Sequence, residues 1–325
     1  MQGVFLSARP GVLGGTLTHV REHLPWLDRL LVITPARLRA QMSELGLEVV
    51  ADEELLGGPA PTDHSHRNYV LRAALAGCNA VDDVFLSSDD DSRPLVDLPE
   101  TTWIREGRYR RYTFGHLDDW YLRATSFDAC LQASRAVLAL HGLPRLAYAA
   151  HMPQVVDKAL LGQVTALFAA AAQRHALDEW ATYFNAAGHR HPERFDPPEP
   201  YVTLGWPDDT ATWQPMLDPG ALLIENTFLE HYAAGAVFDG IDPDDTSYAA
   251  AVDKVVRWRD YELAVLAGER PAALAPQPAI GGIGKALRKA RAATVGDPVL
   301  RQRRERAATA TALRAQARRS GEHLP

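Results

Sequence analysis

The chain of 325 residues is poor in cysteine and has no long apolar run. Its two cysteines, Cys78 and Cys130, lie far apart and outside any CxxC spacing, which excludes a disulfide scaffold and a cysteine zinc site. No apolar run approaches the ~20 residues that are needed to cross a bilayer. The first residues, MQGVFLSARPG, lack a basic start followed by a long apolar segment, so we expect no cleaved leader and a cytoplasmic protein.

Charge is distributed unevenly. The formal net charge is −7, but residues 281–325 carry eleven Lys or Arg against three acids, a net charge of +8 that leaves −15 on residues 1–280. An acidic body argues against a nucleic-acid partner. The basic tail, in which Arg and Lys alternate with Ala and Leu, is typical of an amphipathic helix on an anionic membrane surface, here the inner face of the membrane. The alternative is a solvated helix or a disordered end.

Short apolar strands alternate with helical periodicity in the first third of the chain. The predicted strands cover 3–8, 30–34, 48–51 and 84–88, and the predicted helices cover 15–29, 36–46 and 67–76. This alternation predicts an α/β fold with a doubly wound, mainly parallel sheet. The Arg-, Tyr- and Trp-rich stretch 100–125 is expected to be irregular or antiparallel, and either lines a sugar or nucleotide pocket or forms a strand pair with cationic edges.

Helical patterns dominate the second half. The predicted helices cover 126–141, 154–174, 177–187 and 247–267, and the predicted short strands lie around 201–205 and 221–225. Residues 272–284 have the Pro and Gly content of a linker. We therefore expect three regions: an α/β region over 1–125, a mainly helical region over 126–271, and a linker with a basic helical tail over 272–325.

Three adjacent acids, Asp89, Asp90 and Asp91, directly follow the buried strand predicted over 84–88. Ligands of open α/β sheets bind outside the carboxyl ends of the strands. Carboxylates at that place suit Mg²⁺ or Mn²⁺ holding a diphosphate, with Asp89 and Asp91 beside the metal, as in the Asp-x-Asp motif of nucleotide-sugar transferases. A solvated acidic turn is the alternative.

Three weaker patterns contain histidine or arginine. His64-Ser-His66 opens a predicted helix, where a histidine would bind phosphate or relay a proton, or would only cap a surface helix. His151, between a short apolar strand and a proline, would be a general base or a satisfied core histidine. Arg174 would bind phosphate oxygens with Asp178 as its orienting group or as a base, but their i, i+4 spacing also fits an ordinary surface ion pair.

In this order and spacing, three stretches covering roughly residues 15–180 resemble the Stealth family of sugar-phosphate transferases. They are His23-Leu-Pro-Trp-Leu-Asp-Arg-Leu-Leu-Val-Ile-Thr34; Pro61-Thr62 and Ser65-His66 with Val84-Phe-Leu-Ser-Ser-Asp89-Asp90 and Arg93-Pro94; and Ala150-His151-Met-Pro153 with Lys158, Phe168, Arg174 and Asp178. Glu225-Asn226 is a weak match to a fourth region. The chain departs from the family at Ser7-Ala-Arg9-Pro-Gly11, where the family has Trp-Val-Asp-Gly, and at Ser88, where it has the Asn of Asn-Asp-Asp.

The resemblance implies a GT-A-like fold and an enzyme of cell-surface carbohydrate synthesis, as in bacterial capsules. Such an enzyme moves a sugar-1-phosphate from a nucleotide sugar to the hydroxyl of an acceptor sugar. Residues 1–125 would then bind the donor, and residues 126–271 would serve the acceptor and catalysis. Because the departures fall where donor and metal would bind, two alternatives stay open: a GT-A glycosyltransferase that moves the sugar alone, and an inactive carbohydrate-binding or scaffold protein.

The motifs and the resemblance together assign residue roles. The residues expected to contact the donor are Ser7, Arg9, Asp89 and Asp90. The ligands expected for Mg²⁺ or Mn²⁺ are Asp89 and Asp91. The expected catalytic residues are His151 as the base toward the acceptor hydroxyl, Arg174 and His66 as groups that stabilise charge on phosphate, and Asp178.

Overall fold

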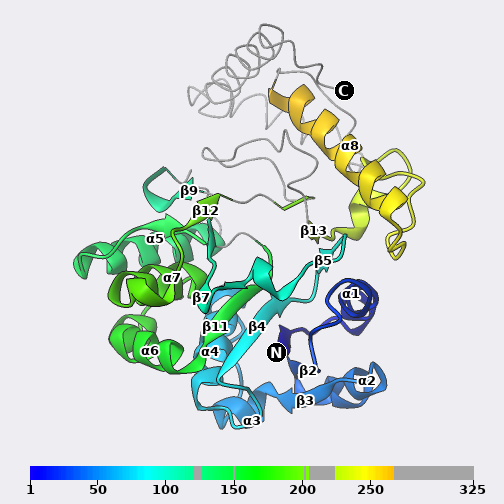
Figure 1. The fold of residues 1–325 in the computed structure, drawn as a ribbon. Helices are drawn as coiled ribbons and strands as arrows, with labels where there is room; N and C mark the ends of the chain where they lie inside the picture. The colour runs from blue at the N-terminus through cyan, green and yellow to red at the C-terminus, as the bar shows by residue number, and fades with distance from the viewer. Residues whose placement is uncertain (114, 120–125, 149–150, 201–202, 205–223, 267–325) are drawn as a thin grey trace, which may run out of the picture. The chain divides into compact units, whose positions relative to one another are not determined.

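A computed structural model describes residues 1–113, 115–119, 126–148, 151–200, 203–204 and 224–266 (Figure 1). The chain divides into two compact units, one made of residues 1–214 with 223–227 and the other of 215–222 with 228–325. The predicted linker and basic tail, 272–325, lie outside the described residues, as do most residues of the strands predicted around 201–205 and 221–225. Within the described part, no helix combines the length and apolarity needed to cross a membrane.

The first unit is built on a five-stranded sheet with the strand order β11-β4-β1-β2-β3. Its strands are β1 (Gln2–Leu6), β2 (Arg29–Thr34), β3 (Glu48–Ala51), β4 (Val84–Asp89) and β11 (Gln154–Asp157). The first four pair in parallel, and β11 pairs antiparallel with β4 at the edge. The predicted doubly wound, mainly parallel sheet is therefore confirmed. The chain winds outward from β1 through β2 and β3 and then adds β4 on the other side of β1, so the topological switch lies between β1 and β4.

The sheet is buried on both faces. The β1 strand is buried along its whole length, and Leu31, Val32 and Ile33 of β2 are inaccessible to solvent. Continuous apolar strands of this kind are typical of parallel sheets covered by helices on both sides. The covering helices include α1 (Pro10–His23), α2 (Arg39–Glu44), α4 (His64–Ala74) and α6 (Lys158–Ala172). Figure 1 shows α6 beside β11, grouped with α5 (Ser126–Leu140) and α7 (Glu179–Arg190), while α1 and α2 lie near β1 to β3.

Two helices start earlier than the sequence predicts. The first, α1, begins at Pro10 rather than at residue 15, because proline at the first helical position has a suitable φ and needs no partner for an N–H. The second, α4, begins at His64 rather than at residue 67. Asp63 caps it, because its carboxylate accepts a 2.8 Å hydrogen bond from the backbone N–H of His66.

The prediction of a helix over 154–174 is wrong for its first turn. Residues Gln154–Asp157 form the edge strand β11, whose β-branched Val155 and Val156 are buried against β4. Asp157 then caps α6 by accepting a 3.0 Å hydrogen bond from the backbone N–H of Leu160. Since β11 belongs to the same sheet as β1, residues from both of the first two predicted regions share one compact unit.

The arginine-rich stretch contains short strands. β6 (Ile104–Arg105) and β7 (Arg108–Tyr109) form an antiparallel pair, as expected for this stretch. Arg105 and Arg108 both form ion pairs with Asp196. These arginines therefore hold the segment that follows α7 against the hairpin.

Further short strands complete the first unit, and one long helix lies in the second. The strands are β5 (Ser92–Pro94), β8 (Tyr112–Thr113), β9 (Gly115–His116), β10 (Leu146–Ala147), β12 (Glu199–Pro200) and β13 (Ile224–Asn226). The short helix α3 (Asp52–Leu56) follows β3 and was not expected from the sequence. The second unit contains α8 (Tyr248–Leu266), which matches the helix predicted over 247–267.

Candidate active site

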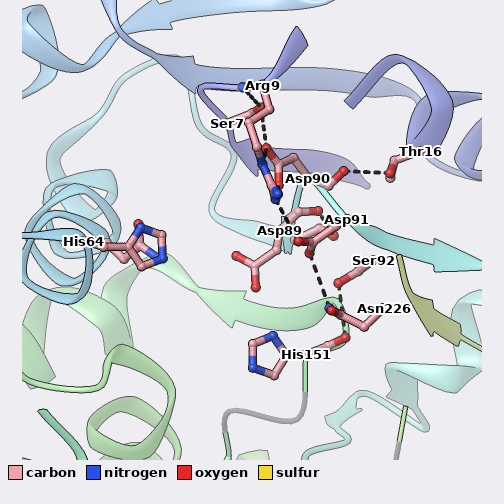
Figure 2. Close-up of polar contacts among 12 residues, drawn as sticks. Ser7, Arg9, Thr16, His64, Asp89, Asp90, Asp91, Ser92, His151 and Asn226 are labelled. Carbon is pink, nitrogen blue, oxygen red and sulfur yellow. Dashed lines mark hydrogen bonds and ion pairs between the residues drawn. The ribbon is translucent and has the colours of Figure 1, made fainter. Parts of the chain in front are cut away.

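The carboxyl ends of β1 and β4 meet at the topological switch of the sheet. Leu6 at the end of β1 lies opposite Asp89 at the end of β4, so the residues that follow both strands are neighbours. Ser7 Oγ donates a 2.7 Å hydrogen bond to Asp90 Oδ2, and the backbone N–H of Arg9 donates to Ser7 Oγ at 3.0 Å. The structure thus brings together Ser7, Arg9 and the acidic triplet, which the sequence analysis assigns to the donor and the metal (Figure 2).

Asp90 is the most buried of the three acids, with only 4% of its surface exposed. Besides Ser7, its carboxylate accepts from Arg9 Nε at 3.1 Å and from Arg9 Nη2. Its backbone carbonyl accepts a 2.6 Å hydrogen bond from Thr16 Oγ1 of α1. These bonds fix the turn after β4 to the turn after β1, so Asp90 holds the shape of the site.

Asp89 is held by a buried arginine that the sequence analysis did not single out. Arg72 Nη2 of α4 lies 2.5 Å from Asp89 Oδ1, and Arg72 Nη1 forms a second ion pair with Glu179 of α7. The guanidinium also lies 4.6 Å from the ring centroid of Trp180. Burial acts to raise the pKa of Asp89, but the charge of Arg72 and its hydrogen bond to Asp89 oppose burial most strongly and help to hold that pKa below its ordinary value.

Asp91 has the weakest anchoring of the three acids. Its carboxylate accepts from Arg9 Nη2 at 2.7 Å and from Asn226 Nδ2 at 3.3 Å, the latter across to β13. Burial, together with the negative charges of Asp89 and Asp90, raises the pKa of Asp91 to about 6. Asn226 Oδ1 is buried and has no hydrogen-bond partner among the described residues. A carboxylate crowded by negative charge beside an amide oxygen without a donor is a setting that a cation would relieve.

Two histidine rings face Asp89. In Figure 2 the carboxylate of Asp89 points into the space between His64, the first residue of α4, and His151. The backbone carbonyl of His151 accepts from Ser92 Oγ at 3.1 Å, and its φ of 48° places it in the left-handed region. Burial lowers the pKa of His151 to about 4, against the opposing effect of Asp89. The imidazole is therefore neutral near pH 7 and able to accept a proton.

The other three predicted catalytic residues take different places. His66 gives its backbone N–H to the Asp63 cap, and of the two histidines in this motif Figure 2 draws His64 facing Asp89. Arg174 is exposed in the connection between α6 and α7. Asp178 is buried and caps α7, since its Oδ1 accepts a 2.6 Å hydrogen bond from the backbone N–H of Ala181. Burial, together with the charge of Glu179, raises the pKa of Asp178 to about 7.

Arg72 and Glu179 are the functional candidates that the sequence analysis missed. One signal was available for Arg72: His64, Asn68 and Arg72 are spaced by four residues and lie on one face of α4, which His66 does not share. Glu179 follows the cap of α7 and is 107 residues away from Arg72 in the chain. Only the packing of α4 against α7 brings this pair together.

The donor set suits a metal that is shared with a ligand. Within the part of the chain that the structure describes, no group of three or more His, Cys, Asp or Glu side chains is arranged to hold a metal ion. Mg²⁺, however, is usually held by one or two carboxylates together with substrate phosphates and waters rather than by an all-protein cage. Asp89, Asp91 and the unpartnered Oδ1 of Asn226 fit a site of that kind.

Comparison with known proteins gives similarity in fold. No protein-family model and no curated protein matches this chain. The galactosyltransferase LgtC, solved with donor and acceptor sugar analogues, is 13% identical over 57% of this chain and 70% of its own, with a TM-score of 0.36. Glucosyl-3-phosphoglycerate synthase from Mycobacterium tuberculosis, solved with Mn²⁺, UDP and phosphoglyceric acid, is 13% identical over 55% and 66%, with a TM-score of 0.31. 4-Diphosphocytidyl-2C-methyl-D-erythritol synthase from Anaerococcus prevotii is 11% identical over 62% of this chain and 87% of its own, with a TM-score of 0.36.

Proposed function

We propose that this protein is a metal-dependent transferase that uses a nucleotide-sugar donor. One observation carries the proposal: the acidic triplet Asp89–Asp91 ends β4 at the topological switch of a parallel sheet, beside Ser7 and Arg9 at the end of β1. Ligands of such sheets bind at that place. Adjacent carboxylates with a nearby arginine suit a diphosphate that is bound through a divalent cation.

Each residue of the triplet has its own task in this proposal. Asp89 and Asp91 would hold Mg²⁺ or Mn²⁺, which when bound neutralises charge on the donor diphosphate and on the departing nucleotide. Asp90 does not need to touch the ion, because its bonds to Ser7 and to Arg9 fix the turn that presents its two neighbours. Arg72 holds Asp89 in place from the protein interior.

His151 is proposed to take the proton from the acceptor hydroxyl. Its ring faces Asp89 (Figure 2), whose negative charge opposes the effect of burial on the His151 pKa and would stabilise the imidazolium that forms. Arg174 and His66 remain proposals for stabilising charge on phosphate, and His64, whose ring faces the same carboxylate, is added to them. The chemistry is then mainly positioning and neutralisation of charge, as in other phosphoryl transfers.

For the finer function we propose transfer of a sugar-1-phosphate to an acceptor sugar hydroxyl, on the resemblance to the Stealth family. The alternative enzyme, a GT-A glycosyltransferase, moves the sugar alone. The products separate the two, because the first yields a phosphodiester and the second a glycosidic bond. We also propose that the basic tail 281–325 contacts an anionic membrane surface near the acceptor, on its net charge of +8.

Thermal-shift screening of nucleotide sugars, with and without Mn²⁺ or Mg²⁺, tests the proposed donor site. A ligand at one hundred times its Kd stabilises the native state by about 2.7 kcal/mol, which is a readily measured rise in melting temperature. We expect a rise that requires both metal and donor and that Asp91→Asn abolishes. Asp82→Asn, which removes an exposed carboxylate paired with Arg29, is the matched control and leaves the rise unchanged.

Two outcomes would overturn parts of the proposal. If no combination of metal and nucleotide sugar raises the melting temperature, the triplet has a structural role only and the scaffold alternative takes the place of the transferase. If the rise persists in Asp91→Asn, the metal assignment is wrong. With the active donor identified, mass spectrometry of the acceptor product then distinguishes a phosphodiester from a glycosidic bond.

A further inference from the structure

Arg9 bridges two of the three carboxylates at the switch point. Its Nε and Nη2 both bind the carboxylate of Asp90, and the same Nη2 lies 2.7 Å from Asp91 Oδ2 (Figure 2). One guanidinium therefore supplies the positive charge at the place where the proposed metal would bind Asp91. This inference rests on the proposed function.

The carboxylates are fixed, whereas the arginine is exposed. The side chains of Asp90 and Asp91 are 6% and 14% exposed, and that of Arg9 is 53% exposed. Asp90 keeps its hydrogen bond from Ser7 and its carbonyl bond from Thr16 whether or not Arg9 is in place. A half-exposed arginine keeps part of its contact with water, so it loses less on leaving an ion pair than a fully buried arginine does. Its contact with Asp91 is therefore the part of this network that is most easily exchanged.

A second group beside Asp91 is incompletely satisfied. The amide of Asn226 donates to Asp91 through Nδ2 at 3.3 Å, a long contact, while its buried Oδ1 lacks a hydrogen-bond donor among the described residues. The two ends of an amide are interchanged by a half-turn of its last torsion. In that orientation Asn226 would present an oxygen beside Asp91, and a pair of oxygens suits a divalent cation.

We infer that Arg9 is a resident cation that competes with the divalent metal for Asp91 and, once displaced, binds the donor diphosphate. Metal binding at Asp91 ends the contact between Nη2 and that carboxylate, and the half-exposed guanidinium, still bonded to Asp90, can then direct N–H groups at a phosphate. Arginine binds phosphate oxygens through paired N–H groups. The incoming diphosphate would therefore replace the carboxylate of Asp91 as the negatively charged partner of the guanidinium. Arg9 therefore opposes the metal alone and favours the metal together with a diphosphate.

Two binding measurements on the full chain with opposite expected signs test this inference. In the first, Mn²⁺ alone is titrated and the free ion is followed by electron paramagnetic resonance. Arg9→Met removes the competing charge, so we expect Mn²⁺ to bind roughly fivefold tighter than to the wild type. Arg9→Lys, which keeps the charge but cannot bridge both acids, should give an intermediate affinity.

In the second measurement, inorganic pyrophosphate is titrated calorimetrically at saturating Mn²⁺. Arg9→Met should bind it roughly tenfold more weakly than the wild type. Arg29→Met is the matched control, since Arg29 is also half-exposed and also pairs with two acids, Glu48 and Asp82, at the amino end of β2. That variant should leave both affinities unchanged.

The pattern of results separates this inference from the proposed function. Equal or weaker Mn²⁺ binding by Arg9→Met overturns the inference, and so does pyrophosphate binding that the substitution leaves unchanged. If the wild type binds Mn²⁺ and Asp91→Asn does not, the metal site of the proposed function stands. Only the proposed competition between Arg9 and the metal is then wrong. If neither the wild type nor Arg9→Met binds Mn²⁺ alone, the inference is overturned, while the proposed function still depends on the thermal shift with metal and donor together.

Discussion

Replacing Arg72 with methionine removes a cation that joins Asp89 of β4 to Glu179 of α7. The arginine side chain is 3% exposed, and those of Asp89 and Glu179 are 28% and 14% exposed. Removing one partner of a buried ion pair costs about 3–5 kcal/mol, because the remaining charge keeps its desolvation penalty. Since Asp89 is partly exposed and methionine still packs on Trp180, we expect a loss of about 3 kcal/mol of unfolding free energy.

A sharper test is whether a second substitution, Glu179→Gln, raises or lowers the free energy of unfolding. In the wild type, Glu179→Gln removes a charge-assisted bond to Arg72 and should cost about 1–2 kcal/mol. In the Arg72→Met background Glu179 is a buried carboxylate without its cation, so the same substitution should stabilise the protein by about 1 kcal/mol at pH 8. The coupling free energy between the two positions is then about 2–3 kcal/mol.

Urea unfolding, followed by far-ultraviolet circular dichroism at pH 8, measures the free energy of unfolding of the wild type, the two single variants and the double variant. Arg145→Met is the control, because Arg145 pairs with Asp118 on the surface, where such a pair contributes little to stability. Additive losses, with Glu179→Gln equally destabilising in both backgrounds, would refute the conclusion that Arg72 compensates two buried carboxylates. A loss below 1 kcal/mol in Arg72→Met would do the same.

Two further predictions concern His151 and the tail. His151→Asn tolerates the left-handed backbone at this position, and it removes an imidazole whose pKa falls from 6.5 to about 4 on folding. As the pH drops from 6.5 to 4, the unfolded chain binds a proton that the folded chain does not. The wild type should therefore lose about 3 kcal/mol of unfolding free energy relative to the variant by pH 4. An equal change of unfolding free energy in both proteins over that range, measured by urea unfolding, would disprove this prediction. Deleting residues 281–325 should abolish sedimentation with phosphatidylserine vesicles, and binding that survives the deletion contradicts membrane contact through the tail.

The fold was predictable where periodicity extends over a whole element. The four parallel strands follow from apolar runs alternating with helical patterns. Their order, which puts the switch between β1 and β4, does not follow from periodicity. The edge strand β11 was not predictable, because Gln154–Asp157 has only four residues and runs directly into the apolar pattern of α6. Its identity as a strand depends on pairing with β4, which is a contact distant in sequence.

The site was predictable only as far as the rule about strand ends extends. That rule places the acidic triplet at the end of β4, and the pairing of β1 with β4 then brings Ser7 and Arg9 to it. It does not choose between His64 and His66, since the choice depends on where α4 begins and which face it turns toward β4. Arg72 was out of reach for a different reason, because its two partners come from β4 and α7.

The three acids differ in how firmly the protein neutralises them, and the difference indicates where a ligand would bind. Asp89 is paired with the buried Arg72, whose removal would leave two carboxylates, Asp89 and Glu179, without this cation. Asp90 is bound by Ser7 as well as by Arg9. Among the described residues, Asp91 has only the half-exposed Arg9 and a long contact from Asn226. A cation that enters the triplet therefore meets the least resistance at Asp91, so the third aspartate, rather than the better-held first one, should control metal affinity.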